Sequence, residues 1–197
     1  PASLSSEKKL DPFIIKKINK LKENNTFLIC ANASRLVSYK GKQLYGIDQC
    51  INVAYKAKSQ KKNIHIIYIV ATSLKSDTGY QKKYQQEIIK NNLCNYISII
   101  FENISFVKLI NECDLVIRPT LTDGDALTIR EALWLEKNII ASDVVKRPKG
   151  TITYKNGNSD ELFNKIIEVM NQDSCKVFNK SKYDYRDSYI KIYDDEK

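Results

Sequence analysis

Two acidic residues, Asp123 and Glu131, lie eight positions apart, on either side of a turn and the start of an expected helix. The turn is Asp123-Gly124-Asp125, and Asp125 is a residue type that caps helices well. The backbone N–H groups of about residues 124–128 would then point outward and bind an anion, while Asp123 would accept hydrogen bonds from a hydroxylated ligand. An ordinary capped helix without any ligand is the alternative.

Glu131 falls inside a helical segment whose neighbouring positions are mostly apolar. An ionised carboxylate on such a face costs several kcal/mol unless it is paired. The adjacent Arg130 is a poor partner, because successive residues of a helix do not face each other. The partner is therefore either a vicinal diol of a ligand, such as a ribose, or a distant cation such as Arg118 or Arg147.

Two cations, Arg35 and Lys40, follow the apolar run 27–31 and are succeeded by Gly41. At the carboxyl end of a strand they would clamp a diphosphate, since Arg offers a fork of donors and Lys a point charge. Two solvated loop charges are the alternative. The same loop has no GxGxxG motif, which disfavours a dinucleotide-dependent dehydrogenase.

The elements that must position these residues alternate along the chain. Apolar runs without alternation, as in strands buried on both faces, occupy residues 27–31, 64–70, 96–101, 115–117 and 138–141. Helical spacing of apolar residues occupies 44–60, 80–92, 105–112, 125–136 and 158–172. This alternation predicts an α/β fold with a Rossmann-like, doubly wound parallel sheet, whose ligands bind at the carboxyl ends of the strands.

Both ends of the chain are expected to be helical. Asp11 and Pro12 are a favourable N-cap and first residue for an amphipathic helix with a basic outer side. The Tyr-rich segment 183–194 predicts a terminal helix. We expect one domain, residues 1–197, in which 1–25 form a linker and the first helix and 182–197 the last helix.

Composition narrows the function classes. The chain has 197 residues, five cysteines, one histidine and a net charge of +9. Scattered cysteines without a CxxC pair argue against a zinc site and against a disulfide framework. Most of them lie in or beside apolar segments, which predicts reduced core thiols in a cytosolic protein. There is no apolar run of membrane-spanning length and no signal segment. The charge suits phosphorylated substrates or an anionic membrane, or reflects a Lys-rich composition; no nucleic-acid-reading helix or aromatic platform is present.

Taken in order, these motifs resemble the C-terminal, donor-binding domain of family 4 glycosyltransferases, which have the GT-B fold. Arg35, Lys40 and Gly41 match that family's Arg-x4-Lys-Gly loop, and Asp123 and Glu131 match its Glu-x7-Glu motif with Asp as the first acid. The segment 141–145 and the Tyr-rich last helix, which in the family crosses back onto the N-terminal domain, are also similar. The resemblance covers about residues 26–195 and extends to a subgroup of bacterial surface-polysaccharide synthesis.

The resemblance implies an enzyme that transfers a sugar from a nucleotide-sugar to an acceptor with retention of configuration, and that needs neither a metal nor a cofactor. Arg35 and Lys40 would hold the pyrophosphate and stabilise the departing nucleoside diphosphate. Asp123 would hold sugar hydroxyls and Glu131 the ribose. The other implied donor-binding residues are Phe101, Glu102 and Asn103 at the base and Gly124, Asp125, Ala126 and Leu127 at the phosphate or sugar.

The chain departs from the family pattern at several points. Asp123 is one carbon shorter than Glu, residues 136–138 replace a Gly-x-Pro, and residues 71–73 replace a Gly-rich turn. The family's acceptor-binding N-terminal domain is absent, so we expect this fragment alone to be inactive. The expected location is cytoplasmic, with peripheral contact at the inner face of the membrane kept open for the basic helix and for the basic region 56–62.

Two other functions stay open. A nucleotide-sugar 2-epimerase shares the fold but uses a histidine near the sugar, and His65 lies within an expected strand. A non-catalytic nucleotide-sugar-binding module would bind donor and transfer nothing.

Overall fold

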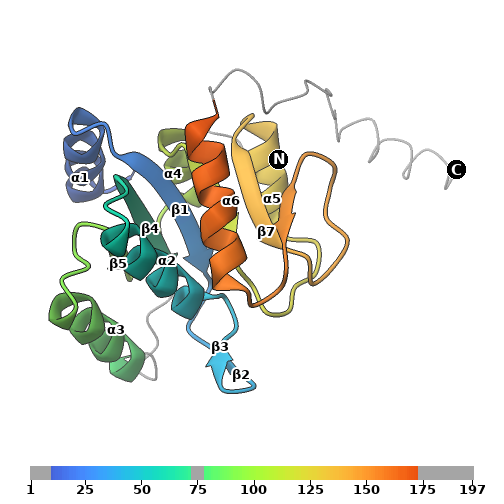
Figure 1. Cartoon of the computed structure of the whole chain (residues 1–197), viewed down its shortest axis with the longest axis horizontal. Coiled ribbons are helices and arrows are strands. Elements are labelled where there is room, and N and C mark those ends of the chain that lie inside the picture. The colour runs from blue at the N-terminus through green and yellow to red at the C-terminus, as the bar shows by residue number, and fades with distance from the viewer. Residues whose placement is uncertain (1–9, 72–77, 173–197) are drawn as a thin grey trace, which may run out of the picture.

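The computed structural model of the protein describes residues 10–71 and 78–172. Its centre is a parallel sheet in the order β5-β4-β1-β6-β7-β8 (Figure 1). The strands are β1 (Phe27–Ala33), β4 (Ile64–Val70), β5 (Ile97–Ile100), β6 (Leu115–Arg118), β7 (Asn138–Ser142) and β8 (Ile152–Tyr154). Because β4 lies on one side of β1 and β6 on the other, the strand order reverses at β1, where sheets of this kind bind ligands.

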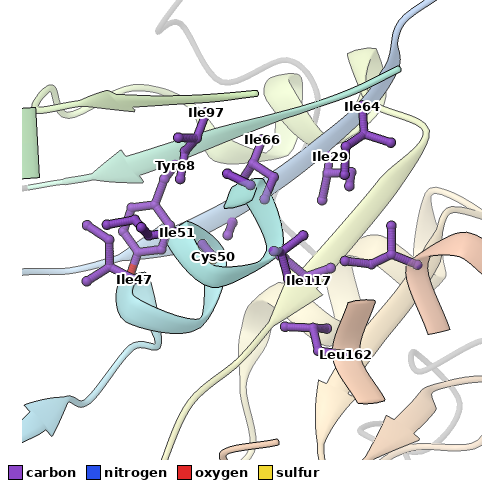
Figure 2. Close-up of a cluster of buried hydrophobic side chains, with 14 of the residues drawn as sticks. Ile29, Ile47, Cys50, Ile51, Ile64, Ile66, Tyr68, Ile97, Ile117 and Leu162 are labelled. Atoms are coloured by element: carbon purple, nitrogen blue, oxygen red, sulfur yellow. The ribbon is translucent and has the colours of Figure 1, made fainter. Parts of the chain in front are cut away.

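Helices cover both faces of the sheet. One face carries α2 (Ile47–Ser59), α3 (Thr78–Lys90) and α6 (Ser159–Asn171), and the other carries α1 (Pro12–Glu23), α4 (Phe106–Glu112) and α5 (Leu127–Trp134). Alternate residues of β1 serve the two faces: Ile29 lies in the cluster under α2 and α6, shown in Figure 2, and Leu28 and Cys30 lie in the cluster under α1, α4 and α5. The predicted doubly wound α/β fold is confirmed.

The first helix begins as its sequence predicts. Asp11 is the N-cap of α1, and its side chain accepts a hydrogen bond from the Phe13 backbone N–H at 2.7 Å. Ile14 and Ile18 are buried against the sheet, Lys16 and Lys20 are exposed, and Lys17 is half-buried. The predicted last helix, residues 182–197, lies outside the described part of the chain.

Three short strands do not appear among the predicted elements. β8 closes the sheet next to β7, and β2 (Ser38–Tyr39) pairs with β3 (Lys42–Gln43) in a separate antiparallel hairpin. Strands of two or three residues contain too few side chains to show a period. They form because neighbouring structure supplies their partners, as the edge of β7 does for β8.

The cysteines mostly match their prediction. Cys30, Cys50 and Cys113 are buried, whereas Cys94 is exposed because it lies in the turn before β5. The prediction of a core thiol is therefore wrong for Cys94, and Cys175 lies outside the described residues. No helix within residues 10–71 and 78–172 has the length and apolarity that a membrane span requires.

His65 is a core residue near the start of β4, at the edge opposite the carboxyl ends of the strands, and is 1 % exposed. Its Nδ1 lies 2.9 Å from the Asn95 carbonyl oxygen and its Nε2 lies 2.6 Å from the Ser98 hydroxyl. If Nδ1 donates to the carbonyl, Nε2 accepts from the hydroxyl, so both contacts suit a neutral ring. Burial lowers the pKa of His65 to about 4.

The pKa of His65 makes stability depend on pH. The unfolded chain takes up a proton at this histidine near pH 6.5 and the folded chain only near pH 4. Protonation therefore favours the unfolded chain as the pH falls below 6.5, and the folded chain keeps its full stability above that pH. We expect the free energy of unfolding to drop by about 2 kcal/mol between pH 7 and pH 5. Urea unfolding across this range measures it. His65→Gln should flatten the pH dependence, because no other histidine exists; an unchanged slope would contradict the assignment.

Candidate functional site

The ends of β1 and β6 are joined by a polar network at the point where the strand order reverses. Arg118, the last residue of β6, donates from Nη1 to the Asn32 side-chain oxygen at 3.4 Å, and the Thr128 hydroxyl of α5 donates to the same oxygen at 3.3 Å. The Arg118 guanidinium also lies 5.5 Å from the centre of the Tyr45 ring. The start of α5 is therefore fixed against both strands at the edge where a ligand is expected.

Asp123 is held between two arginines. Arg118 donates to both of its oxygens, at 3.2 and 3.1 Å, and Arg147 donates to one of them at 3.0 Å. Thr120 adds a hydroxyl donor at 3.1 Å, while Arg147 also donates to the Ser142 carbonyl at 2.9 Å. The side chains of Asp123, Arg118 and Arg147 are only 9 %, 12 % and 2 % exposed. We call these three residues the arginine clamp.

The arginine clamp keeps Asp123 ionised. Burial on its own would raise the pKa of this carboxyl, but the hydrogen bonds and charges of Arg118 and Arg147 together hold the pKa below its ordinary value. The two arginines were the distant partners considered for Glu131, and that alternative is wrong: within the described chain both of them pair with Asp123.

The prediction that Asp125 caps α5 is also wrong. The N-cap is Ala126, which has no side chain to donate or accept, and the helix begins at Leu127. Asp125 is exposed and instead pairs with Arg130, whose Nε lies 2.9 Å from Oδ1. Arg130 holds the pKa of Asp125 below its ordinary value. The ion pair spans the first turn of the helix, which is why the carboxylate is drawn away from the backbone N–H groups that a cap would bind.

Glu131 lies half-buried on α5, and no side chain in the described part of the sequence pairs with its carboxylate. Burial raises its pKa. Leu127 and Trp134, four positions before and three after it, are 60 % and 45 % exposed. The acid thus lies on an open, largely apolar side of the helix, where a ligand hydroxyl can reach it.

The predicted cations belong to the loop that follows β1. Arg35 is exposed in the bend after the strand, and Lys40 with Gly41 forms the two-residue turn of the β2–β3 hairpin. Both turn residues have positive φ, 48° and 75°, as a type I′ turn requires. The Lys40 amino group lies 5.3 Å from the centre of the Tyr39 ring. The hairpin projects from the sheet edge below the start of α2 (Figure 1).

The segment predicted to line a base pocket follows β5. Phe101 is partly buried against the core under α2 and α3, while Glu102 and Asn103 are exposed. β4 separates β5 from β1 in the sheet, so this segment and the arginine clamp flank the end of β1 from opposite sides. Among the described residues, no group of three or more His, Cys, Asp or Glu side chains is gathered for metal binding.

Asn32 and Thr128 were missed as site residues. Both are neutral: Thr128 lies inside the Asp123–Glu131 motif without being one of its acids, and Asn32 lies three residues before the Arg35–Gly41 motif. The available signal is positional, because Asn32 comes just before the end of a buried strand, where parallel sheets place their ligand contacts.

No protein-family model matches the chain, and no curated protein matches it in sequence. Solved structures do match its fold. A glycosyltransferase from Rickettsia africae aligns with a TM-score of 0.61 and 18 % identity, over 82 % of this chain and 42 % of its own. Anabaena Alr3699/HepE, solved with UDP and glucose, aligns with a TM-score of 0.60 and 22 % identity, over 83 % of this chain and 44 % of its own.

A third matching structure consists of a C-terminal domain alone. The C-terminal domain of a group 1 glycosyltransferase, LpcC from Francisella tularensis, aligns with a TM-score of 0.61 and 13 % identity, over 78 % of this chain and 82 % of its own. The chain thus spans less than half of the first two proteins and most of the third. It has the fold of the C-terminal domain of group 1 glycosyltransferases, which is one half of a GT-B structure.

Proposed function

We propose that the chain is the nucleotide-sugar-binding domain of a retaining glycosyltransferase, with Glu131 as the residue that binds the donor's ribose. The observation that carries this proposal is the half-buried Glu131 carboxylate, which has no partner among residues 10–71 and 78–172 and a raised pKa. A half-buried acid without a partner destabilises a fold, and two ribose hydroxyls are donors that would satisfy it. The chain also has the fold of the C-terminal domain of a group 1 glycosyltransferase, which supports the same assignment.

Arg35 and Lys40 take the diphosphate in this proposal. Negative charge grows on the leaving nucleoside diphosphate as the sugar–oxygen bond breaks, so cations already in place lower the barrier. Both cations are exposed at the carboxyl edge of the sheet, one after β1 and one at the hairpin tip. Asp123 shares its oxygens with two arginines and would accept a sugar hydroxyl only alongside them.

Most of the acceptor-binding surface is proposed to belong to another domain, because the chain spans only 42–44 % of the glycosyltransferases that it matches. We therefore expect donor binding by this chain without sugar transfer. A polysaccharide acceptor and a cytoplasmic location, with peripheral membrane contact, belong to the same proposal and rest on the sequence resemblance.

The histidine of this chain gives the epimerase alternative no support. His65 is buried at the edge opposite the carboxyl ends of the strands and is the only histidine of the chain. A binding module without catalysis is distinguished by turnover in the full-length protein.

Titration of the chain with UDP, ADP and GDP tests the proposal. We expect one of the three to bind, and Glu131→Gln to weaken that binding about ten- to hundredfold, because a charge-assisted hydrogen bond to each ribose hydroxyl is lost. Glu136→Gln, an exposed acid just beyond the same helix, is the matched control and should bind as the unmodified chain does. Isothermal titration calorimetry measures both.

The stability of the same variants separates binding from folding. Because burial raises the pKa of Glu131, its ionised form is disfavoured in the folded chain, and the neutral Gln should unfold no more easily at pH 7. A variant that is destabilised and still binds nucleotide would mean that Glu131 has a structural role, and the proposed function would fall.

A further inference from the structure

A basic pocket lies beside the start of α5. It is an open depression of about 540 Å³, a size that accommodates a sugar and its substituents. Residues from two segments line it: Gly124, Asp125, Ala126, Ile129 and Arg130 from the start of α5, and Val145, Lys146, Arg147, Pro148 and Lys149 from the loop that follows β7. Four of these ten residues are cationic and one is acidic.

Two of the four cations in this basic pocket are paired with acids. Arg130 pairs with Asp125, and Arg147 pairs with Asp123 of the arginine clamp. Lys146 and Lys149 are exposed and have no acidic partner in the described part of the chain. The pocket therefore carries an excess of positive charge that its own acids do not neutralise, and such an excess attracts an anionic ligand.

The clamp adds to this excess. Its single acid faces two arginines, so the clamp is itself cationic and borders the pocket through Arg147. The pocket touches α5 through Ile129 and Arg130 and not through Glu131, so a group bound there would lie beside the proposed ribose contact rather than on it.

We propose that the basic pocket binds the negatively charged group, a carboxylate or a phosphate, of an acidic sugar substrate. The inference rests on the proposed function and names its substrate class. The loop of Gly124 to Ala126 forms one wall of the pocket and leads into α5, so a sugar attached to a nucleotide bound at Glu131 would reach the pocket with its acidic substituent toward Lys146 and Lys149. An ammonium group pairs with either anion by a charge-assisted hydrogen bond.

Two nucleotide-sugars that differ only at C6 test the proposal on the full chain. For a uridine site the pair is UDP-glucose and UDP-glucuronate, for a guanosine site GDP-mannose and GDP-mannuronate, and for an adenosine site ADP-glucose and ADP-glucuronate. We expect the acidic donor to bind about tenfold more tightly. The double variant Lys146→Ala/Lys149→Ala should abolish that preference and leave the neutral donor's affinity within about twofold. The matched control Lys16→Ala/Lys20→Ala removes the same charge from α1 and should retain the preference.

A second arm places the acidic group on the acceptor. With the free nucleoside diphosphate bound, methyl glucuronoside and methyl glucoside are titrated against the same variants. Tighter binding of the acidic glycoside, dependent on Lys146 and Lys149, supports the pocket with the group on the acceptor. If the diphosphate binds but neither acidic probe exceeds its neutral counterpart, the inference is overturned and the proposed function stands. If no nucleotide binds, both are overturned.

Discussion

Asp123→Asn is expected to destabilise the protein by about 3–5 kcal/mol, the usual cost of removing one partner from a buried ion pair. The substitution keeps the shape of the side chain and removes its charge. Arg118 and Arg147 would then stay 12 % and 2 % exposed with no acid between them. Two uncompensated guanidinium groups would have to be hydrated or moved, and either change disrupts the edge of the sheet.

Asp125→Asn is the matched control for this substitution. It lies in the same turn and loses the same charge, but its pair with Arg130 is exposed to solvent, and exposed pairs contribute about 1 kcal/mol or less. Urea unfolding followed by circular dichroism compares the two free energies. Equal, small losses would show that the arginine clamp is dispensable for folding.

Lowering the pH should reproduce the loss at Asp123 without a substitution. The pKa of Asp123 is below its ordinary value in the folded chain, so the stabilisation is present above the unfolded pKa and is lost as the pH falls through the folded pKa. This window lies below that of His65, so the two contributions separate along one pH series.

Gly46→Ala is expected to destabilise the protein by about 3 kcal/mol or more. A Cβ at Gly46 would lie 1.9 Å from the Pro119 carbonyl oxygen and 2.7 Å from its carbon, so backbone must shift. Gly46 also has a φ of +71°, which strains any L side chain. The Pro119 oxygen accepts a hydrogen bond from buried Gln49 at 2.8 Å, and the shift would break it. Overpacking of this kind typically costs about 1–3 kcal/mol beyond the backbone strain.

Gly41→Ala isolates the backbone strain. Its φ is +75°, close to that of Gly46, but a Cβ there meets nothing within 4 Å. We expect a loss of about 1 kcal/mol from conformation alone. Thermal and urea unfolding of both variants measure the difference, which is the cost of the contact with Pro119. Similar losses in the two proteins would contradict the close approach of α2 to the end of β6.

The main strands of the sheet and its helices could be predicted because each has a recognisable pattern of apolar residues in its own sequence. β4, for example, is a seven-residue strand buried throughout, and its near-continuous apolar run is typical of a central parallel strand. β8 shows no such run, since only Tyr154 of its three residues is buried. Its position depends on the free edge of β7, which no local pattern reveals.

The sequence indicated candidate site residues but not which acid would pair with which arginine. Asp123, Glu131, Arg35 and Lys40 were proposed from residue type and spacing. The structure places Glu131 in α5 and the other three residues in loops or turns. Which acid meets which arginine depends on tertiary distances between strand ends. Arg147 reaches Asp123 from the loop after β7, a contact that neither residue's neighbours in sequence foretell.

The arginine clamp should constrain how its three residues change during evolution. All three side chains are largely buried, and Asp123 is the acid that pairs with both arginines in the described part of the chain. Replacement of Asp123 by a neutral residue during evolution would leave two buried arginines without an acid. Such a replacement should therefore be tolerated only together with compensating substitutions of Arg118 and Arg147. In diverged relatives the three positions should therefore be retained together or replaced together, as a single heritable unit that ties the end of β6 to the loop after β7.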